Sequence, residues 1–154
     1  PPDWIYLASL LWLAGSLLWQ KTDIEDSYIN SQYKDDIIFT GRLSDADLQK
    51  VLGAAYALSF VPIFEGFGLP IVEAFQSGVP VICSNVTSMP EVAGDAALMV
   101  DPFNIDSIAN GMNKLADNNE LRNELIDKGH QQKMLFSWSR TAELLWDCIQ
   151  MAVK

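Results

Sequence analysis

The chain has 154 residues, of which 49% are hydrophobic and 19% are charged. This length and composition are typical of one globular domain with a single core and exclude a disordered chain, so we expect residues 1–154 to form a single domain. The net charge of −10 would repel a phosphate backbone, which argues against nucleic acid as a partner.

An uncharged segment opens the chain and runs from Trp4 to Trp19, sixteen residues. A membrane-spanning helix needs about 20 apolar residues, and no positively charged segment precedes this run as it would in a signal peptide. We therefore expect no membrane span here.

Strand-like and helix-like patterns alternate along the rest of the chain. We expect Thr22 to cap a helix over Asp23 to Gln32, and Ser44 to cap a helix that runs to about Ala55. Further helices are expected over Leu69 to Ser77, Ile105 to Ala116, Glu120 to Lys133 and Thr141 to Val153. We expect strands over Ile37 to Thr40, Ala57 to Val61, Val79 to Cys83 and Ala97 to Val100, with a loop over Thr87 to Glu91. This alternation predicts an α/β fold, a Rossmann-like parallel sheet with helices on both faces.

A glycine-containing turn separates the second of these strands from the helix that follows. Its sequence is Phe-Glu-Gly-Phe-Gly-Leu-Pro-Ile-Val-Glu-Ala over residues 64–74. Gly66 and Gly68 allow positive φ and a close approach of main-chain amides to a ligand. Pro70 suits the first turn of a helix, and Gly78 its carboxyl end. The amides and the helix dipole then favour a phosphate group beside the turn.

Two glutamates bracket this turn, Glu65 before it and Glu73 about one helical turn inside the helix. Carboxylates are good acceptors for sugar hydroxyls, so an anion-binding helix end with two such acceptors describes a nucleotide-sugar site. The alternative is that Glu73 is a solvated helix residue and the glycine turn is a plain loop.

Further motifs extend the pattern: Ser-Gly-Val-Pro-Val-Ile from Ser77, Ser-Met-Pro-Glu-Val-Ala-Gly-Asp-Ala-Ala from Ser88, and Val-Asp-Pro from Val100. Together with the turn they resemble the donor-binding, C-terminal domain of retaining glycosyltransferases with the GT-B fold, the group 1 family that includes bacterial mannosyl- and glucosyltransferases. The resemblance covers roughly Leu13 to Trp146. It implies a buried strand over Leu10 to Gly15, and it leaves Trp4 to Ser9 as a helix flank or a surface for an absent neighbour.

The resemblance also implies roles for individual residues. Glu65 would face the transferred sugar as the catalytic residue, and Glu73 would hold the ribose hydroxyls. The amides of Gly66, Phe67, Gly68 and Leu69 would meet the sugar or the diphosphate. Arg42 lacks the lysine that follows the diphosphate-binding arginine in the family, so we assign it to the rim of the base pocket.

The implied function is transfer of a hexose from a UDP- or GDP-linked donor to a glycan or lipid-linked acceptor. The acceptor would bind an N-terminal domain that these residues lack, so the chain resembles a fragment that is inactive alone. Family habit suggests polysaccharide assembly in the cytoplasm, and it leaves peripheral contact with the inner face of the membrane open. A non-catalytic nucleotide-binding or interaction module and a nucleotide-sugar epimerase are the alternatives.

Cysteine and histidine usage suggests no other chemistry. Cys83 and Cys148 each lie among apolar residues, so we expect buried thiols rather than a disulfide or metal pair, which fits a reducing compartment. His130 lies in a polar helix and is expected at the surface. No metal-ligand spacing occurs, so we expect no metal and no cofactor besides the donor. Trp138 and Trp146 have helical spacing that favours core packing over stacking on a sugar.

Overall fold

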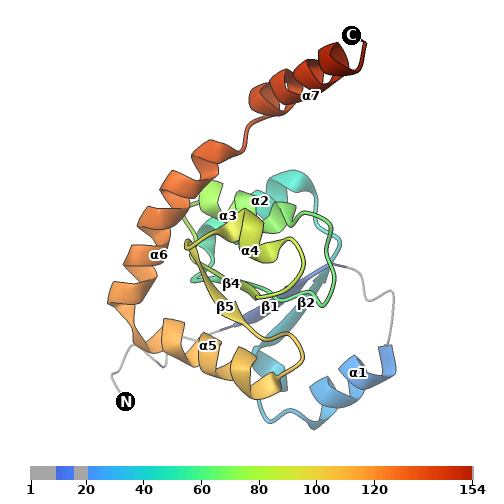
Figure 1. Ribbon diagram of the computed structural model, residues 1–154. Helices are drawn as coiled ribbons and strands as arrows, with labels where there is room; N and C mark the ends of the chain where they lie inside the picture. The colour runs from blue at the N-terminus through green and yellow to red at the C-terminus, as the bar shows by residue number, and fades with distance from the viewer. Residues whose placement is uncertain (1–9, 16–20, 154) are drawn as a thin grey trace. The chain divides into compact units, whose positions relative to one another are not determined.

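The computed structural model describes residues 10–15 and 21–153 (Figure 1). The chain forms two compact units, residues 1–50 and 51–154. Helix α2, Asp45–Ala54, contains the boundary between them. Trp4 to Ser9 lie outside the described residues. Among the helices that are described, none is long and apolar enough to cross a membrane.

The first unit contains a parallel pair of strands, β1 (Leu11–Ala14) and β2 (Ile37–Gly41), with helix α1 (Lys21–Asn30) and the 3-10 helix η2 (Lys34–Asp36) between them in sequence. The predicted strand at the start of the chain is confirmed, but its predicted burial is wrong. Leu11 is 44% and Trp12 is 46% exposed, because β1 pairs with β2 alone in the described sheet. Thr22 falls inside the first turn of α1 rather than at its cap.

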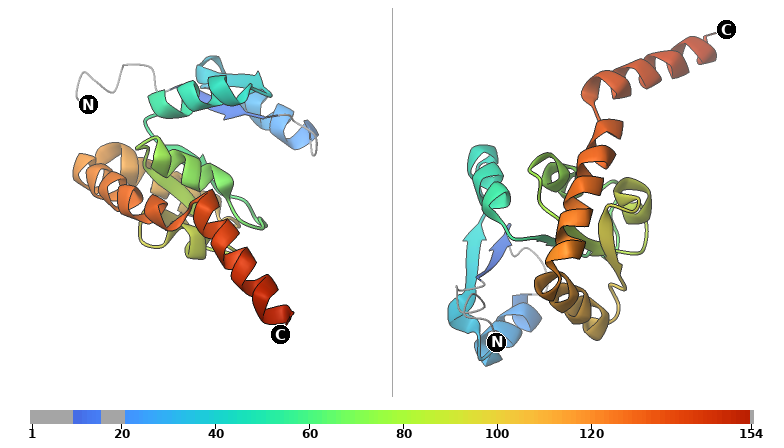
Figure 2. Two further views of the ribbon diagram at one scale, coloured as in Figure 1. Left: turned by 90° about the horizontal axis from the view of Figure 1, so that it is seen from above. Right: turned by 90° about the vertical axis from the view of Figure 1, so that its left-hand side faces the viewer.

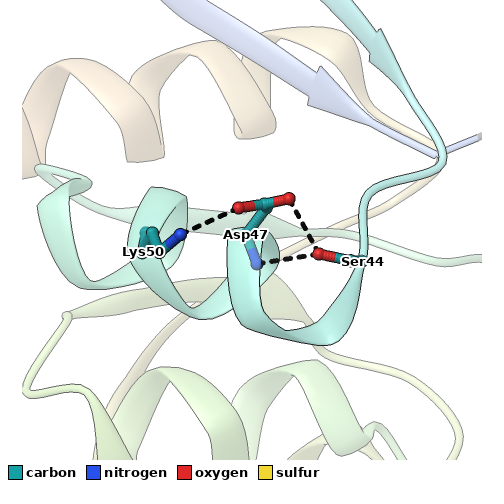
Figure 3. A network of polar contacts seen from close by, with 3 residues as sticks. All are labelled: Ser44, Asp47 and Lys50. Carbon is teal, nitrogen blue, oxygen red and sulfur yellow. Dashed lines mark hydrogen bonds and ion pairs between the residues drawn. The ribbon is translucent and has the colours of Figure 1, made fainter.

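Helix α2 begins at the cap that the sequence predicts. The amide of Asp47 donates to the Ser44 hydroxyl at 3.2 Å, and that hydroxyl donates to the Asp47 carboxylate at 2.8 Å. Lys50 pairs with the same carboxylate at 3.0 Å, as Figure 3 shows. The hydrogen bond from Ser44, and then that from Lys50, lowers the pKa of Asp47 below its ordinary value.

The second unit is built on a parallel sheet in the order β3 (Leu58–Phe60), β4 (Val81–Ser84) and β5 (Ala97–Val100). Its helices are α3 (Leu69–Gln76), α4 (Met89–Ala93), α5 (Ile105–Asp117), α6 (Asn119–Gln132) and α7 (Trp138–Ala152), with the 3-10 helix η3 (Lys133–Leu135) after α6. Every residue of β4 is buried, which explains its continuous apolar sequence.

Helices cover both faces of this sheet. Phe75 of α3 and Met89 of α4 pack with Val81 and Cys83 on one face. On the other face, Ile82 and Val100 pack against Leu115 of α5 and Leu125 of α6. Successive residues of a strand point to opposite faces, so the short central strand serves both cores. The predicted α/β fold class, with a parallel sheet flanked by helices, is confirmed.

Two segments of the second unit also differ from the sequence-based expectation. A short helix, α4, replaces the predicted loop, because Pro90 suits its first turn and Gly94 ends it at φ +56°. None of the residues of α7 is buried, and Figure 2 shows this helix extending away from the sheet of its unit. The prediction that Trp138 and Trp146 pack in the core is therefore wrong, since they are 83% and 59% exposed.

One of the two cysteines is buried in the sheet and the other is exposed on α7. Cys83 in β4 is fully buried, and burial raises the pKa of its thiol to about 12. Cys148 on α7 is exposed, so the prediction of two buried thiols is wrong for this one. The neighbours that made Cys148 look buried, among them Trp146 and Ile149, are exposed with it. Both thiols are free.

Candidate functional site

The glycine turn follows the carboxyl end of β3 and leads directly into α3. Ligand sites of parallel α/β sheets form beyond the carboxyl ends of the strands. Gly68 is the residue before the helix, with φ +101° and ψ +47°, and its carbonyl accepts the amide of Ile71 at 3.0 Å. The positive φ predicted for Gly68 is confirmed. Gly66 does not have a positive φ, and a Cβ at that position would meet nothing within 4 Å.

The start of α3 lies directly after this turn, where the amide of Ile71 is already bonded to the Gly68 carbonyl. The first amide groups of a helix have no partner within it and carry the positive end of the helix dipole. Pro70 lies in the first turn, where its missing N–H is tolerated. At the other end of α3, Gly78 has φ +69° and its amide bonds to the carbonyl of Phe75, as expected for a glycine that ends a helix.

The two glutamates have different surroundings. Glu65 is half-buried, and its carboxylate accepts the amide of Gly66 at 3.1 Å. Its backbone carbonyl accepts the hydroxyl of Ser88 at 2.8 Å. Glu73 is exposed on α3. One carboxylate is thus fixed close to the turn, and the other is open to solvent.

The apolar residues of the turn are partly used for packing. The ring of Phe67 lies edge-on to that of Phe136, with 5.8 Å between the ring centroids. Leu69 is 54% and Phe64 is 81% exposed. Phe67 is 43% exposed, so its ring packs on the protein at one edge and is otherwise open to solvent.

Residues 87–89, which precede and begin α4, contact the glycine turn. A Cβ placed on Gly68 would lie 2.7 Å from the terminal methyl of Met89, a side chain that is fully buried. Thr87 has φ +56°, which is rare for a β-branched residue. From the sequence, residues 85–88 could either contact the donor or form a simple polar loop, and nothing in the pattern indicated that Ser88 bonds to Glu65, 23 residues earlier.

The remaining candidate residues lie elsewhere. Arg42 is exposed and belongs to the first unit, just after β2, and its role stays a prediction. His130 is exposed, as expected. An open pocket of about 360 Å³ between α1 and the strands of the first unit is lined mainly by apolar side chains, including Leu13, Ile24 and Phe39, and contains no predicted site residue.

Comparison with known proteins identifies the family. The sequence profile of the family described as "Glycosyl transferases group 1" matches residues 11–132. The chain belongs to this family. The O-antigen chain mannosyltransferase B of Escherichia coli is 42% identical over 102 residues, which are 66% of this chain and 27% of that protein. The MMP alpha-(1->4)-mannosyltransferase of Mycolicibacterium hassiacum is 34% identical over 112 residues, 70% of this chain and 27% of that protein.

Two solved structures have a fold similar to that of the chain. Sucrose-phosphate synthase from Thermosynechococcus elongatus has a TM-score of 0.79 and 24% identity, over 93% of this chain and 38% of that one. HepE from Anabaena, in complex with UDP-glucose, has a TM-score of 0.81 and 16% identity, over 92% of this chain and 41% of that one. The chain therefore spans about a quarter of the length of the two mannosyltransferases and about two fifths of these structures.

Proposed function

We propose that the chain is the donor-binding part of a retaining glycosyltransferase and binds a UDP- or GDP-linked hexose at the turn before α3. The observation that carries this proposal is the geometry of that turn. Left-handed Gly68 opens the start of α3, half-buried Glu65 precedes it and exposed Glu73 follows about one helical turn later. The names of the mannosyltransferase relatives and the UDP-glucose bound to HepE support the same donor class.

Each residue then has a part in the proposed site. The amides of Phe67, Gly68 and Leu69 bind the sugar or the diphosphate, where the helix dipole favours negative charge. The amide of Gly66, which the sequence grouped with them, donates to the Glu65 carboxylate and so holds that side chain beside the donor. Glu73 accepts hydrogen bonds from the ribose hydroxyls, and Glu65 faces the transferred sugar. Arg42 is proposed for the rim of the base pocket. No metal or further cofactor is included, because the sequence offers no ligand spacing for one.

In the proposed reaction, the bond between the anomeric carbon and the diphosphate oxygen breaks, and a bond to an acceptor hydroxyl oxygen forms on the same face of the sugar. The acceptor proton leaves with the diphosphate or solvent. Cationic groups stabilise the departing diphosphate, and a further domain binds the glycan or lipid-linked acceptor. The chain alone is then expected to bind donor weakly and to transfer nothing. We place the reaction in the cytoplasm, at or near the inner face of the membrane.

Calorimetric titration of the chain with UDP-glucose and GDP-mannose tests the binding step. We expect millimolar binding of one of them that Glu73→Ala abolishes. Glu143→Ala, which changes an exposed glutamate on α7, is the matched control and should bind like the unchanged chain. Absence of binding by either donor at millimolar concentration would favour a non-catalytic interaction module of the same fold.

A further inference from the structure

Beside the proposed catalytic glutamate lies one side chain from a distant part of the sequence to which the proposed function gives no role. The hydroxyl of Ser88, at the start of α4, donates to the backbone carbonyl of Glu65 at 2.8 Å, and the bond is partly buried. A carbonyl in a turn has no regular backbone partner, so this hydroxyl replaces one. We propose that Ser88 is a positioning residue that orients Glu65 toward the sugar, an inference that rests on the proposed function.

Glu65 is held at two points. Its carbonyl accepts from Ser88, and its carboxylate accepts from the amide of the next residue, Gly66, at 3.1 Å. The second bond is local and can form only while the peptide between these residues keeps its orientation. Fixing the carbonyl fixes that peptide, because the carbonyl of one residue and the amide of the next belong to the same planar unit. Ser88 therefore acts on the carboxylate through the backbone.

The neighbours of Ser88 strengthen this connection. Met89 packs under Gly68, at the other end of the turn, with its terminal methyl 2.7 Å from where a Cβ would lie. Thr87 has φ +56°, and it is the one non-glycine residue with positive φ in the described part of the chain. Unusual backbone of this kind persists only when its surroundings hold it in place. Consecutive residues after β4 thus contact both ends of the turn that carries Glu65.

A second serine supplies a matched comparison. The hydroxyl of Ser77 donates to the carbonyl of Glu73 at 2.9 Å, so it bonds to the other glutamate in the same way. That carbonyl also accepts the backbone amide of Ser77 at 3.0 Å within the helix end. Removing the Ser77 hydroxyl should leave Glu73 in place, whereas removing the Ser88 hydroxyl leaves the Glu65 carbonyl without its bond.

The test compares Ser88→Ala, Ser88→Thr and Ser77→Ala in a full-length transferase that contains this chain, with donor kinetics. Small misplacement of a reacting group can cost about 100-fold in rate. We expect Ser88→Ala to lower kcat about 10- to 100-fold while KM for the donor changes less than about twofold. Ser88→Thr should restore most of kcat because it keeps the hydroxyl, and Ser77→Ala should leave both constants unchanged.

A second measurement needs no donor. Amide exchange followed by NMR in the 154-residue chain should be faster for Gly66 in Ser88→Ala than in the unchanged chain or in Ser77→Ala. Ser88→Cys, which is similar in size but a weak donor, replaces the alanine variant if that variant does not fold. Unchanged kcat and unchanged Gly66 exchange would overturn the inference, as would failure of Ser88→Thr to restore kcat. Loss of donor binding by the unchanged chain would instead contradict the proposed function.

Discussion

Replacing Gly68 by alanine should destabilise the second unit, whereas the same change at Gly66 should not. The two glycines lie two positions apart in the same turn, but they differ in conformation and in surroundings. Gly68 has φ +101°, and a Cβ there would meet Met89 at 2.7 Å. Gly66 has no positive φ, and a Cβ there meets nothing within 4 Å. Comparing the two variants therefore separates the effect of the left-handed, crowded position 68 from the effect of replacing any glycine in this turn.

The cost of Gly68→Ala has two sources. Left-handed backbone costs a residue with a Cβ about 1–2 kcal/mol. Overpacking a filled site costs about 1–3 kcal/mol, and the lower end applies because the nearest atom is the end of a flexible methionine side chain. Met89 is fully buried, so it cannot move at no cost. We expect a loss of about 2–3 kcal/mol in the free energy of unfolding for Gly68→Ala. For Gly66→Ala we expect no loss, or a gain of up to about 1 kcal/mol.

Urea denaturation followed by far-ultraviolet circular dichroism measures both variants against the unchanged chain. A shift of the midpoint without a change in slope reports stability alone. The turn geometry described here is refuted if Gly68→Ala unfolds within about 0.5 kcal/mol of the unchanged chain, or if Gly66→Ala loses as much as Gly68→Ala.

Three further predictions concern burial and charge. A thiol reagent at pH 8 should modify Cys148 rapidly and Cys83 only after unfolding, because burial raises the pKa of Cys83 to about 12 and closes off its sulfur; rapid modification of both thiols would contradict this. Phe75→Ala should cost about 3–5 kcal/mol, since Phe75 is 1% exposed, whereas Trp138→Ala at 83% exposure should change stability by less than about 0.5 kcal/mol in the same urea experiment. Similar losses for the two would show that α7 is packed. The carboxyl carbon of Asp47 should titrate in NMR below pH ~3.9, because the hydrogen bonds from Ser44 and then from Lys50 lower its pKa. The stability that this pairing contributes is lost as the pH falls through the lowered pKa, and titration above pH ~3.9 would contradict the pairing.

Much of the fold could be predicted from the sequence, because apolar runs, helix caps and glycine turns each depend on a few neighbouring residues. The strand Ala97–Val100 has the bounds that its apolar run predicts. Ser44 caps α2 because the serine and the aspartate three residues later bond to each other within one turn. The glycine at position 68 was identified from the motif, and its left-handed backbone matches what only glycine adopts at little cost.

The errors come from features that depend on other parts of the molecule. An amphipathic helix pattern shows which face is apolar, but it does not show whether anything packs on that face. For that reason Trp146 and Cys148 were placed in a core and are exposed. The bond between Ser88 and Glu65 joins residues 23 positions apart and depends on tertiary structure. Positive φ at Thr87 runs against the preference of a β-branched residue, so no sequence rule predicts it.

The central claim is that the glycine turn before α3 binds a nucleotide sugar. The most direct measurement is an NMR titration of the amide-labelled chain with UDP-glucose and with GDP-mannose, followed residue by residue. We predict millimolar, saturable shifts in the amides of Gly66 to Leu69 and of Glu73 with one of the two donors, and their loss in Glu73→Ala. Saturable shifts elsewhere with none in this turn, or shifts that persist unchanged in Glu73→Ala, would contradict the claim.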